Sequence, residues 1–214
     1  MKASFWFDKW QSREIAFHEG KVNQLLEKHV NELKLRPHAH IFVPLCGKTK
    51  DIAWLLKQGL HVTGAELSKT AIDELFDELE MTPKIEKIDK FEVYKSRHLT
   101  VFVGDFFELT TSHIQAVDAV YDRAAFIAMP RTMLQDYSCK LIELANNAPQ
   151  LLIGYTYDQN LVAGPPFSVS QTKLVHYYGQ EYKINQLEII DSEDNIKGVA
   201  PAQEGCWLLY SSVD

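Results

Sequence analysis

Long hydrophobic runs and an excess of basic residues are both missing from this sequence. No apolar stretch approaches the about 20 residues that a membrane-spanning helix needs, and Asp8 and Lys9 stand where a signal peptide would have its apolar region. The chain carries 22 basic and 29 acidic residues, whereas proteins that bind nucleic-acid duplexes usually carry a basic excess. We therefore expect contact with neither a membrane nor a nucleic acid.

Cysteine is scarce, and the motifs of common metal and hydrolase sites are missing. The three cysteines, Cys46, Cys139 and Cys206, have no CxxC spacing, which is typical of a reduced cytoplasmic protein. The histidines form no H-E-x-x-H or Cys/His cluster, and there is no G-x-S-x-G elbow. We therefore expect no bound metal and no hydrolase of that type.

What the sequence does have is the composition of one globular domain. Hydrophobic residues make up 46% of the 214 positions and charged residues 24%, the usual range for a folded domain. No repeat, low-complexity tract or flexible linker divides the chain. We expect a single domain over residues 1–214.

Short apolar strands alternate with amphipathic helices along the chain. Strands are expected at residues 41–45, 61–66, 100–103, 117–121, 151–155, 187–190 and 207–210. Helices are expected over residues 21–34, before Gly59, after an N-capping Ser68 and after Pro130. The alternation predicts an α/β fold with a doubly wound, Rossmann-like sheet of about seven mostly parallel strands. The segment 191–203 has no helical period and suits a hairpin, so the last strand should be antiparallel.

Candidate binding residues follow the ends of the first four strands. Ligands of open parallel sheets bind beyond the carboxyl ends of the strands. These positions hold Leu45 to Gly47, Glu66, Asp105, Phe106 and Arg123. Glu66 lies nineteen positions after Gly47, a distance at which an acidic residue commonly binds ribose hydroxyls. The alternative is an exposed carboxylate that precedes the Ser68 cap.

The loop after the first strand favours a ligand without phosphates. A dinucleotide site needs G-x-G-x-x-G, and Gly47 has no such companions. Gly47, Lys48 and Thr49 match the second half of a P-loop, but its first glycine would stand at position 42, which is Phe42.

S-adenosylmethionine fits the same positions better than a nucleotide does. Glu66 would bind its ribose, and the backbone from Leu45 to Gly47 would meet its methionine portion. Asp105 and Phe106 would border the adenine.

Aromatic residues are concentrated near the N-terminus. The first twenty residues include Phe5, Trp6, Phe7, Trp10 and Phe17. Trp6 and Trp10 are four positions apart and would share a helix face. The segment is either an aromatic anchor packed on the sheet or a lid over the ligand, whose sulfonium would be attracted to aromatic faces. The nearby Asp8, Lys9 and Arg13 are too polar for a plain core strand, so we favour a lid formed by residues 1–20.

Several motifs, in family order, resemble the thiopurine S-methyltransferase family, most like its bacterial members. The motifs are Phe5-Trp6-Phe7-Asp8-Lys9-Trp10, Ala16-Phe17-His18, Val43-Pro44-Leu45-Cys46-Gly47-Lys48, Val62 to Ser68, Gly104-Asp105-Phe106-Phe107, Tyr121-Asp122-Arg123-Ala124-Ala125 and Gly164-Pro165-Pro166-Phe167. The resemblance implies a class I methyltransferase sheet of seven strands. It also implies methyl transfer from S-adenosylmethionine to sulfur, leaving S-adenosylhomocysteine.

The resemblance further implies roles for individual residues. At the cofactor it places Trp10, Leu45, Glu66 and Arg123, with Trp6, Asp105 and Phe106 nearby. It places Phe17 on the substrate side. Arg123 is permanently charged and would steady an anionic acceptor as well as the cofactor, which makes it our candidate catalytic residue. Its alternative role is an ion pair with Asp122 or Asp105.

The expected function is methyl transfer to aromatic and heterocyclic thiols such as thiopurines, and to selenium or tellurium compounds. The partner is then a small thiol, and we expect a cytoplasmic monomer. The alternative is a nucleotide-binding protein of the same fold that transfers no methyl group.

Overall fold

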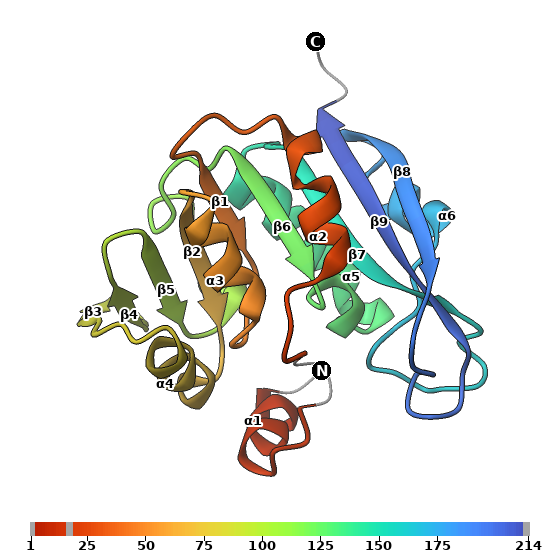
Figure 1. The fold of residues 1–214 in the computed structure, drawn as a ribbon, viewed down its shortest axis with the longest axis horizontal. Helices are drawn as coiled ribbons and strands as arrows, with labels where there is room; N and C mark the ends of the chain where they lie inside the picture. The colour runs from red at the N-terminus through yellow and green to blue at the C-terminus, as the bar shows by residue number, and fades with distance from the viewer. Residues whose placement is uncertain (1–2, 16–18, 212–214) are drawn as a thin grey trace.

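A computed structural model describes residues 3–15 and 19–211, which form an α/β fold (Figure 1). The helices are α1 (Ala3–Gln11), α2 (Gln24–His29), α3 (Lys50–Lys57), α4 (Lys69–Glu78), α5 (Arg131–Ala145) and α6 (Gln171–Tyr178). The strands are β1 (His40–Val43), β2 (His61–Glu66), β3 (Lys84–Ile88), β4 (Phe91–Lys95), β5 (Leu99–Val103), β6 (Ala119–Arg123), β7 (Gln150–Tyr157), β8 (Tyr182–Asp191) and β9 (Ala202–Ser211). Short 3-10 helices lie at Val30–Leu33, Phe106–Glu108 and Phe126–Ala128.

The described strands form one sheet in the order β3-β4-β5-β2-β1-β6-β7-β9-β8. The central strands from β5 to β7 are parallel, and β9 is antiparallel to β7 and to β8. The predicted fold class, with an antiparallel last strand, is therefore confirmed. The sheet has two strands more than the about seven expected, because the hairpin of β3 and β4 extends the edge beside β5.

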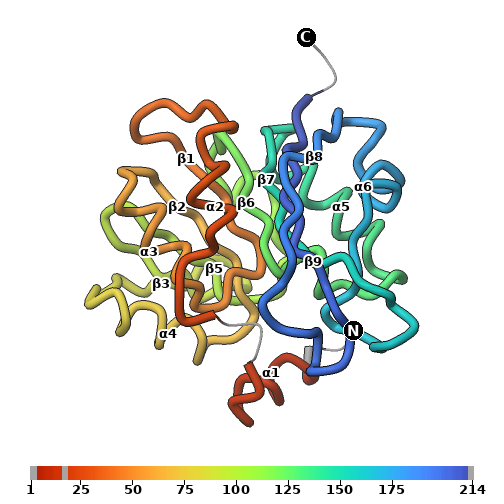
Figure 2. Tube along the Cα trace, turned by 45° about the vertical axis from the view of Figure 1, so that its right-hand side comes forward, coloured from red at the N-terminus to blue at the C-terminus, as the bar shows by residue number. Residues whose placement is uncertain are grey.

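Helices cover both faces of the sheet, as a doubly wound fold requires. Apolar side chains of α2, α3 and α4 pack with one face, and those of α5 and α6 pack with the other. Figure 2 shows the two helical layers on opposite sides of the strands. Side chains of adjacent strand residues alternate between the layers: Phe42 belongs to one core and Val43 to the other.

Local signals set where the helices begin and end. The helix expected over 21–34 is shorter in the structure. It begins after Asn23, whose side chain caps it by accepting the N–H groups of Leu25 and Leu26. After His29 the chain continues as a 3-10 helix. Ser68 caps α4 through the N–H of Ala71, as predicted. Among the described residues, no helix has both the length and the apolar character needed to cross a membrane.

Candidate functional site

The turn after β1 contains two residues in the left-handed region. Leu45 has φ 46° and Gly47 has φ 51°. Glycine adopts this conformation readily, but a leucine there is strained, and such strain gathers at functional sites. The turn is fastened to β2, since Cys46 donates its N–H to the carbonyl of Ala65 at 2.9 Å. The strand pairing thus holds a strained turn at the carboxyl edge of the sheet.

Glu66 ends β2 directly beside this turn. Its Oε2 accepts the N–H of Gly47 at 2.8 Å, and its Oε1 accepts the N–H of Ser68 at 2.8 Å. The residue is only 6% exposed, so the alternative of an exposed carboxylate is wrong. Burial raises the pKa of Glu66, although the backbone N–H groups of Ser68, Gly47 and Leu67 act against that shift. A buried acceptor therefore lies between the ends of two parallel strands.

Helix α1 lies beyond the carboxyl ends of the strands (Figure 1), and Trp10 is its contact with the turn. The side chain is 3% exposed, and a Cβ added to Gly47 would lie 3.3 Å from Trp10 Cζ2. Trp6 is on the same helix, as predicted, and packs against the core on the α5 side. Arg13 Nη1 reaches Glu74 Oε1 of α4 at 2.5 Å, which fastens the end of this segment.

A cleft of about 460 Å³ opens between α1 and the start of α4. Its lining residues are Phe7, Trp10, Gln11, Arg13, Ser68, Lys69 and Thr70. The carboxylate of Glu66 accepts the N–H of the lining residue Ser68, so the cleft adjoins the candidate ribose site.

The residues after β5 divide between surface and core. Asp105 is exposed, and its side chain accepts the N–H of Phe107 at 3.0 Å. The ring of Phe106 is buried against Tyr137, with centroids 5.1 Å apart, so this side chain is a core residue. Phe17, the predicted substrate-side residue, lies outside the described residues.

Arg123 ends β6 and forms ion pairs that the sequence analysis did not identify. Its side chain is 9% exposed; Nη2 lies 2.6 Å from Glu19 Oε1, and Nη1 lies 3.3 Å from Asp51 Oδ2. The expected alternative partners, Asp122 and Asp105, are not among these contacts. Asp122 instead accepts the N–H of Phe126 and the hydroxyl of Tyr137, and burial raises its pKa to about 6. 

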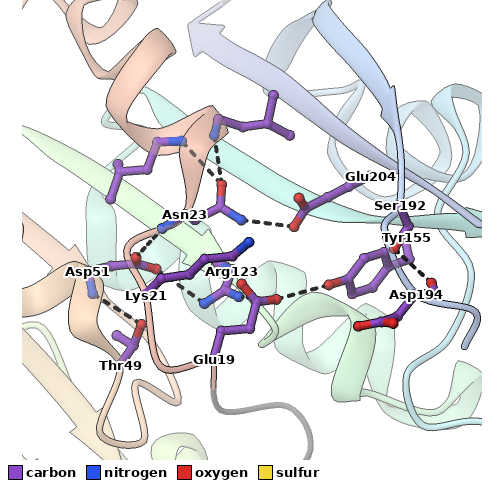
Figure 3. Close-up of polar contacts among 12 residues, drawn as sticks. Glu19, Lys21, Asn23, Thr49, Asp51, Arg123, Tyr155, Ser192, Asp194 and Glu204 are labelled. Atoms are coloured by element: carbon purple, nitrogen blue, oxygen red, sulfur yellow. Dashed lines mark hydrogen bonds and ion pairs between the residues drawn. The ribbon is translucent and has the colours of Figure 1, made fainter. Parts of the chain in front are cut away.

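The ion pairs of Arg123 belong to a larger polar network (Figure 3). Asp51, in the first turn of α3, is fully buried and accepts the hydroxyl of Tyr121 and the backbone N–H of Asn23, each at 2.9 Å. Asn23 donates its amide to Glu204 Oε1 at 2.9 Å. The hydroxyl of Tyr155 donates to Glu19 Oε1 at 3.1 Å. The network joins the segment before α2 to the ends of β6 and β7 and to the start of β9.

The network keeps its arginine charged. Burial opposes the charged form of Arg123, but Tyr121, Asp51, Glu19 and Glu204 outweigh burial and raise the pKa of Arg123. Burial also raises the pKa of Glu204, although Arg123 acts in the opposite direction.

Sequence reasoning missed Glu19, Asp51, Tyr155 and Glu204. One signal could have found Glu204: an antiparallel strand begins at the edge where its parallel neighbours end. Glu204, near the start of β9, accordingly pairs in register with Tyr155 near the end of β7.

The strand order brings most of the predicted site residues to one edge. Glu66 and Arg123 end β2 and β6. Leu45 and Gly47 follow the neighbouring β1, and Asp105 and Phe106 follow β5. Trp10 covers the turn from beyond this edge. Within residues 3–15 and 19–211, no group of three His, Cys, Asp or Glu side chains is arranged to hold a metal ion.

Comparison with known proteins gives consistent matches. The family model described as thiopurine S-methyltransferase matches residues 1–209. A thiopurine S-methyltransferase of Teredinibacter turnerae is 42% identical over 214 residues, covering 100% of both chains. One from Xanthobacter autotrophicus is 44% identical, covering 98% of this chain and 99% of the relative.

Solved structures share the fold at low sequence identity. The 1,6-didemethyltoxoflavin-N1-methyltransferase of Burkholderia thailandensis, solved with 1,6-didemethyltoxoflavin and S-adenosylhomocysteine, has a TM-score of 0.67. It is 11% identical, and the match covers 98% of this chain and 87% of that chain.

Proposed function

We propose a cofactor site and an acceptor for this chain on the premise that it belongs to the thiopurine S-methyltransferase family. The family model spans residues 1–209, and the relatives match over nearly their whole length. The protein is therefore an S-adenosylmethionine-dependent S-methyltransferase.

The observation that carries the cofactor site is the buried carboxylate of Glu66 beside the turn after β1. An ionised carboxylate has about four lone-pair positions; the N–H groups of Gly47 and Ser68 use two of them here, and that of Leu67 interacts more weakly. The remaining positions would accept the two ribose hydroxyls. Leu45 and Gly47 would meet the methionine portion, because both lie in the strained turn beside Glu66.

The other predicted residues complete the cofactor site. Asp105 and the backbone of Phe106 would border the adenine, because the Phe106 ring is committed to the core. Trp6 and Trp10 would contribute from α1. These residues suit a molecule without phosphates, since the turn lacks the additional glycine of a phosphate-binding loop.

The chain's own task in the reaction is alignment and exclusion of water. S-adenosylmethionine supplies a methyl group already activated by its sulfonium. Arg123 holds the anionic acceptor and is always charged, so the acceptor can bind as a thiolate. A heteroaryl thiol is acidic enough to need no strong base. Cys46 is not a reacting thiol, because burial raises its pKa well above the usual value.

We propose that residues 1–20 act as a lid within one domain spanning residues 1–214. The burial of Trp10 against Gly47 and the Arg13–Glu74 ion pair support this role, because they hold α1 against the turn after β1 and against α4. A closed lid would keep water from the reacting sulfur.

We propose aromatic and heterocyclic thiols, including thiopurines, as acceptors, with selenium and tellurium compounds as further ones. We propose a monomer that acts on these small acceptors. Three free thiols, one of them exposed, support a cytoplasmic location.

The test is a screen with methyl-labelled S-adenosylmethionine over aryl thiols, a thiopurine, selenite and tellurite. We expect label on the sulfur of the aryl thiols and the thiopurine. Binding of S-adenosylhomocysteine without transfer to any acceptor would contradict the proposal and favour a binding protein of the same fold.

A further inference from the structure

The carboxylate of Glu19 is held as a bound anion would be held. Its Oε1 receives Arg123 Nη2 at 2.6 Å and the hydroxyl of Tyr155 at 3.1 Å. The two donors come from the ends of the adjacent strands β6 and β7, and Figure 3 shows the Glu19 carboxylate between them. A charged guanidinium together with a hydroxyl is a common arrangement for binding carboxylates and other small anions.

Tyr155 is a stable donor in this arrangement. Burial raises its pKa, and the nearby Glu204 and Glu19 carboxylates add to the shift. The hydroxyl therefore keeps its proton at neutral pH and can donate to an anion.

The surrounding charges leave no place for an additional anion. Glu19, Asp51 and Glu204 all interact with Arg123. The nearby Lys21 also interacts with Glu19 and Glu204, but it is exposed and its main partner is Glu193 at 3.1 Å, so it balances these carboxylates only in part. A thiolate that joined this group would add a further negative charge close to three carboxylates.

Glu19 is the carboxylate that can leave most easily. Its side chain is 30% exposed, whereas Asp51 is fully buried and holds Tyr121 and Asn23. The next residue, Gly20, has no atom within 4 Å of the position of an added Cβ, so space is available beside this segment.

We propose that Arg123 and Tyr155 form an anion subsite for the acceptor, and that Glu19 is its internal occupant, which an anionic acceptor displaces. The ligand class is an aromatic thiolate or aromatic carboxylate. One negative charge leaves and one enters, so the charge around Arg123 is unchanged. The inference rests on the proposed function, because it assigns the acceptor side of the same site, and it makes Glu19 a specificity-determining residue.

Benzoate tests the subsite without turnover, because its carboxylate matches that of Glu19. Calorimetry would measure benzoate binding to the protein saturated with S-adenosylhomocysteine. Glu19→Gln removes the competing charge and should tighten benzoate binding about tenfold, which corresponds to about 1.4 kcal/mol. Tyr155→Phe in the Glu19→Gln background should weaken it again. Glu143→Gln is the control, since Glu143 pairs with Lys140 on α5.

Steady-state kinetics give a second readout. With 4-nitrothiophenol, which is ionised at neutral pH, Glu19→Gln should lower KM about tenfold, with a much smaller change in kcat. Unchanged benzoate affinity and KM would overturn the inference. So would a fall in kcat confined to weakly acidic thiols, which would make Glu19 a base. Absence of methyl transfer by the wild type would instead count against the proposed function, and the benzoate titration would still decide the subsite.

Discussion

Gly47 donates its backbone N–H to the Glu66 carboxylate at 2.8 Å, which joins the turn after β1 to the end of β2. A glycine with φ 51° and a buried carboxylate are thereby combined into one rigid unit. Trp10 covers this unit from α1. The proposed cofactor site is built around this contact, and the predictions below begin with it.

Replacing Glu66 should weaken cofactor binding. Glu66→Ala removes a charged acceptor from the proposed ribose site, so S-adenosylhomocysteine affinity should fall by on the order of 1.5–3 kcal/mol, the range for hydrogen bonds to charged groups. Isothermal titration calorimetry measures the change, with Glu143→Ala as the control on α5. Wild-type affinity in a folded Glu66 variant would remove this residue from the site.

Replacing Arg123 by lysine should impair both activity and stability. Lysine keeps the charge, but its single ammonium group cannot contact Glu19 and Asp51 together as the two Nη atoms of the planar guanidinium do. We expect methyl transfer to fall by on the order of tenfold or more, and the free energy of unfolding to fall by about 1–3 kcal/mol because buried Asp51 loses a charged partner. Turnover and urea unfolding are compared with Arg131→Lys, an exposed arginine on α5. Wild-type turnover would limit Arg123 to a structural role.

Trp10 distinguishes a lid from an aromatic anchor. If α1 is a lid, Trp10→Ala should reduce cofactor affinity and turnover while the free energy of unfolding changes by less than about 1 kcal/mol. Hydrogen exchange of residues 5–11 should slow when S-adenosylhomocysteine binds. If α1 is an aromatic anchor, Trp10→Ala should instead lower the free energy of unfolding by about 3–5 kcal/mol. Equal exchange protection with and without ligand would also contradict the lid.

Asp122 should give the protein a specific pH dependence of stability. Burial raises its folded-state pKa from 3.8 to about 6, so the folded state binds a proton more tightly than the unfolded state. The stability from that proton is present below about pH 4 and is lost as pH rises through about 6, a total of about 3 kcal/mol. Asp122→Asn has no such proton to lose, and its stability relative to wild type should therefore improve by about that amount between pH 4 and pH 7.

Urea unfolding at several pH values measures the effect. The exposed Asp136→Asn should follow the wild-type profile. Parallel profiles for Asp122→Asn and wild type would show that the buried carboxylate does not titrate in this range.

Much of the fold could be predicted from local pattern, and the exceptions have physical reasons. The apolar runs that became β1, β2 and β5 to β7 are typical of strands buried on both faces. Strand β3 was missed because its sequence, Lys-Ile-Glu-Lys-Ile, lies at the exposed edge of the sheet and lacks a continuous apolar run. Helix 21–34 was predicted too long because periodicity alone does not mark the Asn23 cap.

The site residues also fall into those that a local sequence pattern predicts and those that it does not. Glu66 and Gly47 could be found because their spacing reflects one strand–helix–strand unit. The partners of Arg123 could not, because Glu19 lies 104 positions away and Glu204 comes from an antiparallel strand whose pairing is set by the whole sheet. Such contacts depend on tertiary structure and leave no local pattern.

The most direct test of the central claim is a single-turnover reaction with methyl-labelled S-adenosylmethionine and a heteroaryl thiol, followed by mass spectrometry of the acceptor. The claim is that the edge formed by β1, β2 and β6 binds this cofactor and directs its methyl group to sulfur. The wild type should place the label on the acceptor's sulfur, and Glu66→Ala at the same cofactor concentration should place markedly less there. A protein that binds S-adenosylhomocysteine but labels no thiol, or a Glu66→Ala variant that labels as fast as wild type, would contradict this account.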